Sequence, residues 1–139
     1  MNRKYIICAA ASAVLLIGLA AFISNTDGKG RHGNEAQTLD QYQLEPYLNL
    51  CGWDVSLISS EEIRIPSRFE GVYSEYAALQ KEQGFDLDSH KGCDAMRYTY
   101  SVNNYGRDNV RAELILCENV LIAADIYENT PDGFMERIK

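Results

Sequence analysis

The longest uncharged stretch of the chain lies near its N-terminus and divides the sequence into two parts. Residues 5–23 form a largely apolar run of 19 residues without a charge. As a helix rising about 1.5 Å per residue, this run spans about 28 Å, close to the hydrocarbon thickness of a bilayer. Arg3 and Lys4 precede the run, so the positive-inside rule places the N-terminus in the cytoplasm and the rest of the chain outside.

Residues 1–24 are therefore predicted to be a transmembrane helix that anchors the protein in the cell membrane. The alternative is a cleaved signal peptide, which would make the protein secreted. The apolar run is longer than the usual signal-peptide core of about 7–15 residues. Phe22-Ile23-Ser24 also lacks the pattern of small residues expected at a cleavage site. Both features favour the anchor.

The segment after the anchor is predicted to be a flexible linker, residues 25–37. Its first twelve residues include three glycines and almost no apolar side chain. Such a segment buries too little surface to offset its chain entropy. The remaining residues, 38–139, suffice for one hydrophobic core. They are predicted to form a single extracytoplasmic domain.

The part of the chain beyond the anchor is acidic. The whole chain has 13 basic and 20 acidic side chains, a formal charge of −7. Without Arg3 and Lys4, residues 24–139 keep 11 basic and 20 acidic side chains, a balance of −9. An acidic surface repels nucleic-acid phosphates, so nucleic acid is excluded as a partner. The expected partners are the membrane, through residues 5–23, and an unidentified protein or cell-envelope component.

The first half of the domain is predicted to hold one helix and two short strands. Thr38 and Gln41 match a capping box, which places the helix start near Thr38. Pro46 is expected to kink or split this helix, and Gly52 to end it. Alternation predicts a strand over residues 53–59 and a second strand around residues 63–65 that stops before Pro66.

The second helix is predicted to begin at a capping box formed by Ser67 and Glu70 and to end at Gly84. Its apolar stripe has helical spacing. The stripe consists of Phe69, Val72, Tyr73, Tyr76 and Leu79.

Three further strands are predicted over residues 96–102, 110–116 and 120–127, joined by short connections into an antiparallel meander. The last strand is apolar on both faces as far as Asp125, which indicates that both faces are covered. The sequence thus predicts an α+β fold of order α-β-β-α-β-β-β. Both helices are expected to pack on one face of the antiparallel sheet.

The cysteines beyond the anchor suggest one disulfide. A strand register that sets Arg97 opposite Glu113 also sets Cys93 opposite Cys117. We therefore predict a Cys93–Cys117 disulfide, with two unpaired thiols as the alternative. Cys51 is expected to be a buried small side chain. No metal site is predicted, because four converging ligands cannot be named.

No catalytic or cofactor-binding constellation can be assembled from the sequence. Asp125 interrupts an apolar strand, so it should be buried beside a partner such as Arg111 or a backbone cap, or line a small site. Gln80 and Asp86 are further polar site candidates. The predicted function is a membrane-tethered binding module without catalytic activity. The alternative is a small extracytoplasmic hydrolase or metal-dependent enzyme that uses His90 and nearby carboxylates.

Several short motifs along residues 38–137 follow a recognisable order. They are Cys51-Gly52-Trp53-Asp54-Val55, Ile65-Pro66, Phe69, Val72-Tyr73, Tyr76, Leu79-Gln80, Gly84-Phe85-Asp86-Leu87, Lys91-Gly92, Arg97-Tyr98-Thr99-Tyr100, Asn104-Tyr105, Val110-Arg111-Ala112, Asp125 and Gly133-Phe134-Met135. In this order they resemble a family of exported domains of Gram-positive bacteria, catalogued as the domain of unknown function DUF4830. The resemblance implies an N-terminal membrane segment followed by one domain, and it brings no activity. Glu118-Asn119 stands where the family often has Asn-Gly.

Overall fold

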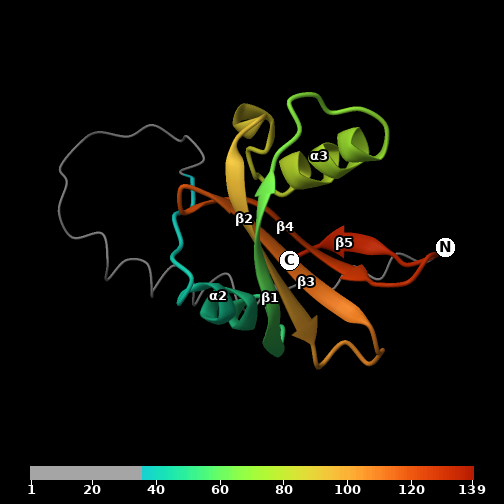
Figure 1. Cartoon of the computed structure of the whole chain (residues 1–139). Helices are drawn as coiled ribbons and strands as arrows, with labels where there is room; N and C mark the ends of the chain where they lie inside the picture. Colours follow the sequence, from blue (N-terminus) through green and yellow to red (C-terminus); the bar gives the residue numbers. More distant parts are fainter. Residues whose placement is uncertain (1–35) are drawn as a thin grey trace.

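A computed structural model describes residues 36–139 of the chain, and the predicted anchor and nearly all of the linker lie outside them. The described part contains two α-helices, one short 3-10 helix (η1) and one five-stranded antiparallel sheet of order β1-β2-β3-β4-β5 (Figure 1). The elements are α2 Leu44–Leu50, β1 Val55–Arg64, α3 Val72–Glu82, η1 Asp88–His90, β2 Asp94–Val102, β3 Val110–Cys117, β4 Val120–Glu128 and β5 Met135–Arg137. Within residues 36–139 no helix is long and apolar enough to cross a membrane.

The α+β class is confirmed, but the predicted order of elements is wrong at two places. One long strand, β1, replaces the two short strands expected before the second helix. A fifth strand, β5, was not predicted and pairs with the end of β4. Its turn depends on Gly133, where an added Cβ would lie 2.0 Å from the Glu128 carbonyl oxygen.

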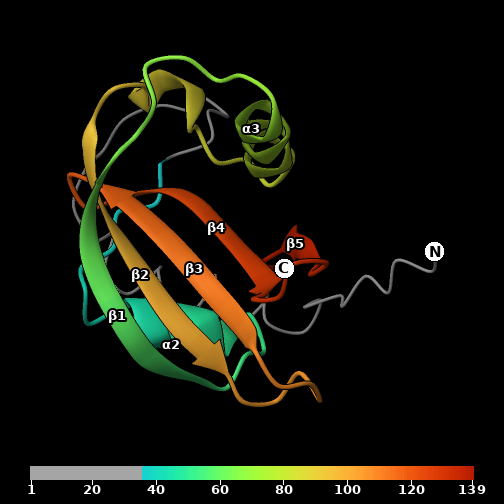
Figure 2. The same cartoon turned by 45° about the vertical axis from the view of Figure 1, so that its right-hand side comes forward.

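The two helices pack on opposite faces of the sheet, so the prediction that they share one face is wrong. Along β3, Ala112 and Leu114 pack in the core under α2, whereas Ile115 and Cys117 pack in the core under α3. Because successive strand residues point to opposite sides, these two cores lie on different faces. We call these sides the α2 face and the α3 face. Figure 2 shows α2 behind the sheet at one end and α3 at the other end.

The first helix begins later than predicted. Thr38 forms an isolated bridge with Val120, so the chain there is extended rather than helical. The Asp40 carboxylate accepts the backbone N–H of Gln43 at 3.1 Å and thereby holds the turn that leads into α2. Pro46 fits in the first turn, where its missing N–H is not needed. Gly52 ends the helix with φ 92°, as expected.

The second helix also starts later than predicted but ends where expected. The residue before α3 is Gly71, with φ 56° and no side-chain cap, so the Ser67 capping box is not formed. Gly84 follows the helix with φ 86°, and the Phe85 N–H closes on the Gln80 carbonyl at 3.0 Å. Val72 from the predicted stripe is 83% exposed. The residues that pack on the sheet are Tyr73, Tyr76, Ala77 and Gln80.

The meander of β2, β3 and β4 is confirmed, with a register displaced by two residues from the predicted one. Glu113 faces Thr99, and Arg97 faces Ile115. A two-residue turn joins β3 to β4, and both of its residues have positive φ: 50° at Glu118 and 66° at Asn119. Positive φ at both positions defines a type I′ turn, which favours Asn-Gly.

Replacing both turn residues, Glu118→Asn with Asn119→Gly, should therefore stabilise the domain. A side chain such as Glu tolerates the left-handed region at a cost of about 1–2 kcal/mol, whereas Asn and Gly enter it readily. We expect the free energy of unfolding to rise by about 1 kcal/mol, measured by chemical denaturation. Glu118→Gln is the matched control, because it removes the charge and keeps the strain. An equal gain in the control would assign the effect to charge.

Candidate functional site

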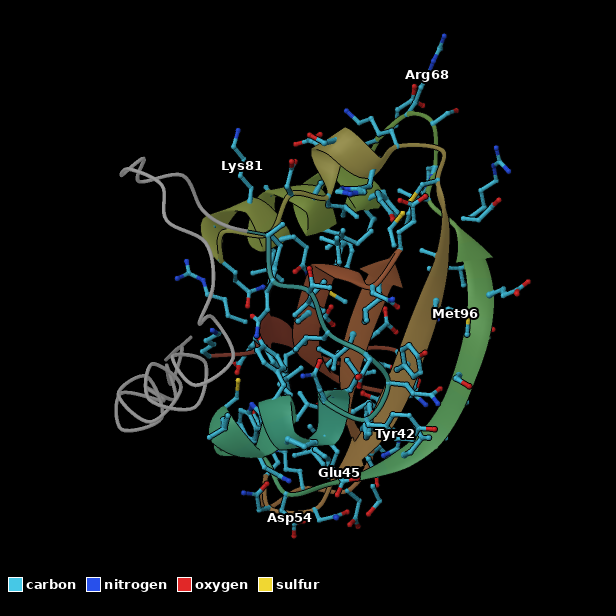
Figure 3. All side chains as sticks on the ribbon, turned by 90° about the vertical axis from the view of Figure 1, so that its left-hand side faces the viewer. Tyr42, Glu45, Asp54, Arg68, Lys81 and Met96 are labelled. Atoms are coloured by element: carbon cyan, nitrogen blue, oxygen red, sulfur yellow. The ribbon has the colours of Figure 1, made fainter. Side chains whose placement is uncertain are left out.

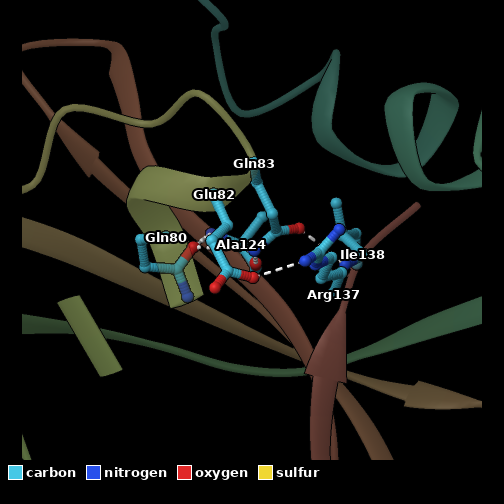
Figure 4. A network of polar contacts seen from close by, with 6 residues as sticks. All are labelled: Gln80, Glu82, Gln83, Ala124, Arg137 and Ile138. Atoms are coloured by element: carbon cyan, nitrogen blue, oxygen red, sulfur yellow. Dashed lines mark hydrogen bonds and ion pairs between the residues drawn. The ribbon is translucent and has the colours of Figure 1, made fainter. Parts of the chain in front are cut away.

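Two glutamines, Gln80 of α3 and Gln83 directly after the helix, attach α3 to the backbone edge of β4. The Ala124 N–H donates to Gln80 Oε1 at 2.9 Å, and Gln83 Nε2 donates to the Ala124 carbonyl at 2.9 Å. Gln83 Oε1 also accepts the backbone N–H of Ile138 at 2.8 Å, beyond the end of β5 (Figure 4). An unpaired buried backbone group costs about as much as a lost hydrogen bond. The two glutamine side chains therefore satisfy the backbone groups of Ala124 and Ile138 in place of a neighbouring strand.

Loss of the Gln83 side chain should destabilise the domain more than its partial burial suggests. Gln83→Ala leaves the Ala124 carbonyl and the Ile138 N–H without their partners, at about 1–3 kcal/mol for each buried group. We expect the free energy of unfolding, measured by urea denaturation, to fall by about 2 kcal/mol or more. Gln41→Ala is the control, because Gln41 is exposed in the turn before α2. Equal effects of the two changes would contradict the role given to Gln83.

The neighbouring residue on β4, Asp125, is a buried carboxyl group. Its side chain has no exposed surface. Oδ1 accepts hydrogen bonds from the Tyr76 hydroxyl at 3.0 Å and from Gln80 Nε2 at 3.3 Å. Oδ2 is buried and has no hydrogen-bond partner. The sequence-predicted candidates Gln80 and Asp125 therefore meet, and Arg111, the partner suggested from the sequence, bonds instead to the Val110 carbonyl at 3.0 Å.

Burial determines the electrostatics of this carboxyl group. Burial, followed by the nearby charge of Glu113, raises the pKa of Asp125 to about 8, and the Tyr76 and Gln80 hydrogen bonds only partly oppose this. Burial also raises the pKa of Glu113, with Arg97 acting in the opposite direction. The pKa of Tyr76 is raised well above 10.0, first by burial and then by Asp125. Asp125 thus retains its proton near neutral pH.

No basic side chain of the α3 region is placed to neutralise Asp125. Lys81 on α3 and Arg68 before it are exposed and extend away from the sheet (Figure 3). Arg137 lies opposite Asp125 in the β4–β5 register, but its guanidinium pairs with Glu82. The hydrogen bonds and the neighbouring carboxylate therefore define the surroundings of Asp125.

Asp125 should make the fold less stable as the pH rises. Its folded pKa of about 8 exceeds the ordinary 3.8. Between these values the folded state holds a proton that the unfolded state has lost, so stability is greatest below this window and falls through it. We expect Asp125→Asn to flatten the decline by up to about 1.4 kcal/mol per pH unit between pH 5 and pH 7, in denaturation series. Asp108→Asn, in an exposed loop, is the control and should follow the wild type. Identical slopes for the wild type and Asp125→Asn would contradict this assignment.

Beyond α3, polar side chains continue across the same face of the sheet. The register aligns Thr99, Glu113 and Asp125 in one row, and Tyr127 lies two residues further along β4. Thr99, Glu113 and Tyr127 are half-buried, as is Arg97, which forms an ion pair with Glu61. We call Arg97, Thr99, Glu113 and Tyr127 the polar patch. Figure 2 shows that α3 covers one end of this face and leaves the other end of β3 and β4 without a helix.

Charges within the polar patch act on one another. Burial, then Glu113 and Asp125, raise the pKa of Tyr127, whereas Arg97 and Arg111 lower it. The patch therefore combines a cation, a carboxylate and hydroxyl groups over a protonated carboxyl. Such a surface can bind a polar ligand through several hydrogen bonds.

The remaining sequence-predicted candidates lie elsewhere. Asp86 is exposed, and its carboxylate accepts the backbone N–H of Ser89 at 3.2 Å. Hydrogen bonding from the Ser89 side chain, followed by this backbone bond, lowers the pKa of Asp86 against the effect of burial. His90 Nδ1 lies 2.7 Å from the Asp86 carbonyl oxygen. These contacts share no residue with those of Asp125. Within residues 36–139, no three His, Cys, Asp or Glu side chains are grouped so that they could hold a metal ion.

The aromatic residues of the predicted apolar stripe, and Tyr105 elsewhere in the domain, serve packing. Phe69, Tyr73 and Tyr76 form a series of ring contacts, with centroids 4.9 and 5.5 Å apart. Tyr105 stacks on Trp53 at 5.8 Å. Sequence reasoning missed Gln83, although its i, i+3 spacing from Gln80 was visible. It also missed the role of Glu113, because the two-residue register error paired this residue with Arg97.

The predicted disulfide partners are present as thiols. Cys93 is half-buried and Cys117 is buried. Continuing the observed β2–β3 register past Met96 and Leu116 would set Cys117 opposite Ala95 rather than Cys93. Cys51 is buried in the α2-face core, as predicted.

Fold and site together define a small α+β domain with one helix on each face of an antiparallel sheet and a buried carboxyl group under α3. A sequence profile of the domain of unknown function DUF4830 matches residues 47–126. The match covers more than half of the chain, and the chain belongs to this family. No curated protein and no solved structure matches it.

Proposed function

We propose that the chain is a membrane-tethered extracytoplasmic binding module that acts without a catalytic step. In this proposal, residues 5–23 are the anchor, residues 25–37 are the tether, and the described domain recognises a partner outside the cytoplasm. The charge-free run after Arg3 and Lys4 supports the topology. An exported member of a Gram-positive cell envelope would have this arrangement.

The observation that carries the binding function is the polar patch beside α3. Binding surfaces combine partly exposed polar groups with a rigid support, and here the support is the centre of a five-stranded sheet. Arg97 offers donors, Glu113 offers acceptors, and the Tyr127 hydroxyl offers both. A ligand that hydrogen-bonds to these groups would lie across β2, β3 and β4, next to Tyr76 of α3.

The separation of the polar candidates argues against the hydrolase or metal-dependent alternative. A hydrolase based on His90 needs a carboxylate and a substrate site beside the imidazole. The His90 ring faces a backbone carbonyl, and the Asp86 carboxylate is occupied by the Ser89 N–H. Asp125 is enclosed under α3 with no exposed surface. These placements support a binding role over acid–base chemistry.

One experiment tests topology and binding together. A photo-crosslinking residue replaces Thr99 in the full-length protein, intact cells are irradiated, and trypsin is then added outside. Lys29 and Arg31 lie in the proposed tether, so trypsin should release the domain together with a discrete crosslinked species. The matched control carries the crosslinker at Ser60, an exposed position on β1, and should release the domain without that species.

The two parts of the proposal fail separately in this experiment. A domain that trypsin releases only after cell lysis would exclude the extracytoplasmic location. A released domain with the same crosslinks from Thr99 and Ser60, or with none from either, would exclude the polar patch as the binding surface. A domain found in the medium before trypsin would favour the cleaved signal peptide over the anchor.

A further inference from the structure

Two cysteines meet at the end of the sheet where β3 turns into β4. Cys93 lies directly before β2, and Cys117 is the last residue of β3. Cys117 is part of the α3-face core, and Cys93 packs against this core. Cys117 Sγ donates to the carbonyl oxygen of Asp94, the residue directly after Cys93, at 3.7 Å.

We propose that Cys93 and Cys117 are a disulfide-forming pair that is closed by exchange with an external disulfide. Both side chains pack in the α3-face core, although the register makes them diagonal rather than directly opposite neighbours. The Cys117 sulfur lies 3.7 Å from the carbonyl oxygen of Asp94, which adjoins Cys93 in the chain. After burial, the Cys117 thiol is the next cause of the raised pKa of Cys93, in agreement with this proximity.

The sheet itself excludes the competing pairing with Cys51. Cys51 is 1% exposed and belongs to the α2-face core. Cys93 and Cys117 belong to the opposite side, so the backbone layer of the sheet separates Cys51 from both. Of the three cysteines in the described part of the chain, only one pair can therefore form without rearrangement.

An external disulfide, written RSSR, is the oxidant and is reduced to two molecules of the thiol RSH. Cys93, the more accessible thiol, loses its proton and attacks one sulfur of RSSR, which releases one RSH and leaves a mixed disulfide. Cys117 then attacks the Cys93 sulfur, and the second RSH leaves with the second proton. Burial, followed by the contact with Cys117, raises the pKa of Cys93 to about 12. Few thiolates exist near neutral pH, so uncatalysed exchange should be slow and the bridge structural rather than rapidly reversible.

The bridge would fasten the connection between α3 and β2 to the centre of the sheet. The Cys93 carbonyl already accepts the N–H of Ile65, the residue directly after β1, at 2.9 Å. A covalent bond to Cys117 would therefore join the end of β1, the start of β2 and the β3–β4 hairpin. Its stabilisation would come largely from restricting the unfolded chain.

The test uses the full-length protein in detergent, oxidised with glutathione disulfide, alkylated and digested with trypsin without reduction. We expect peptides 92–97 and 112–137 to be recovered as one linked species that separates on reduction. We also expect the oxidised protein to unfold roughly 10 °C or more above the reduced protein. Cys51→Ser is the matched control and should give the same linked species and the same difference.

Single Cys93→Ser and Cys117→Ser variants should lose the difference between oxidised and reduced unfolding temperatures. The oxidised and reduced forms of the same variant are compared, so a packing defect present in both forms does not mimic this loss. Recovery of both wild-type thiols as separately alkylated or glutathione-bound peptides would overturn the proposal. So would linkage of either peptide to peptide 32–64, which contains Cys51. Since the oxidant is added in vitro, this outcome is independent of the proposed membrane topology.

Discussion

The outer backbone edge of β4 is the constraint on which the arrangement of the domain depends. Three segments satisfy this edge: the extended residues at Thr38, Gln80 and Gln83 at the end of α3, and β5. Each comes from a different part of the sequence, so the edge is complete only when the whole domain has folded. Side-chain amides can replace a strand here because each offers both a donor and an acceptor. The position of α3 is therefore set by directional hydrogen bonds as well as by apolar contact.

The buried carboxyl group under α3 follows from the same docking geometry. Gln80 uses its oxygen for the Ala124 N–H, which leaves its amide nitrogen facing Asp125. A protonated Asp125 fits this environment better than a charged one, because burial disfavours the ionised form. An apolar residue at this position would leave the Gln80 amide without its acceptor. Asp125 can thus be explained by packing alone, and the polar patch beside it is the surface that we propose for recognition.

Local signals in the sequence predicted part of this structure correctly. The alternation in β2, β3 and β4 and the glycines that end both helices depend on neighbouring residues only, and these elements were placed correctly. The start of α2 was misplaced because Thr38 joins the sheet through Val120, a residue far away in the chain. The polar residues in the second half of β1 are extended because they pair with β2. They lie at an exposed edge of the sheet, where a strand needs few apolar residues, so the hydrophobic pattern does not indicate a strand there. The burial of Asp125 was predictable, whereas its partners depended on how α3 crosses β4.

The long edge strand β1 has a consequence for how copies of the domain meet one another. It is the outermost strand at its side of the sheet and most of its residues are exposed, and such edges can join between molecules. A register shift between Leu57 and Ser59 interrupts the regular spacing, and Glu61, Glu62 and Arg64 place charges along the rest of the strand. Both features hinder annealing of one edge to another. Crowded neighbours would therefore collide and separate as individual molecules instead of growing into a shared sheet.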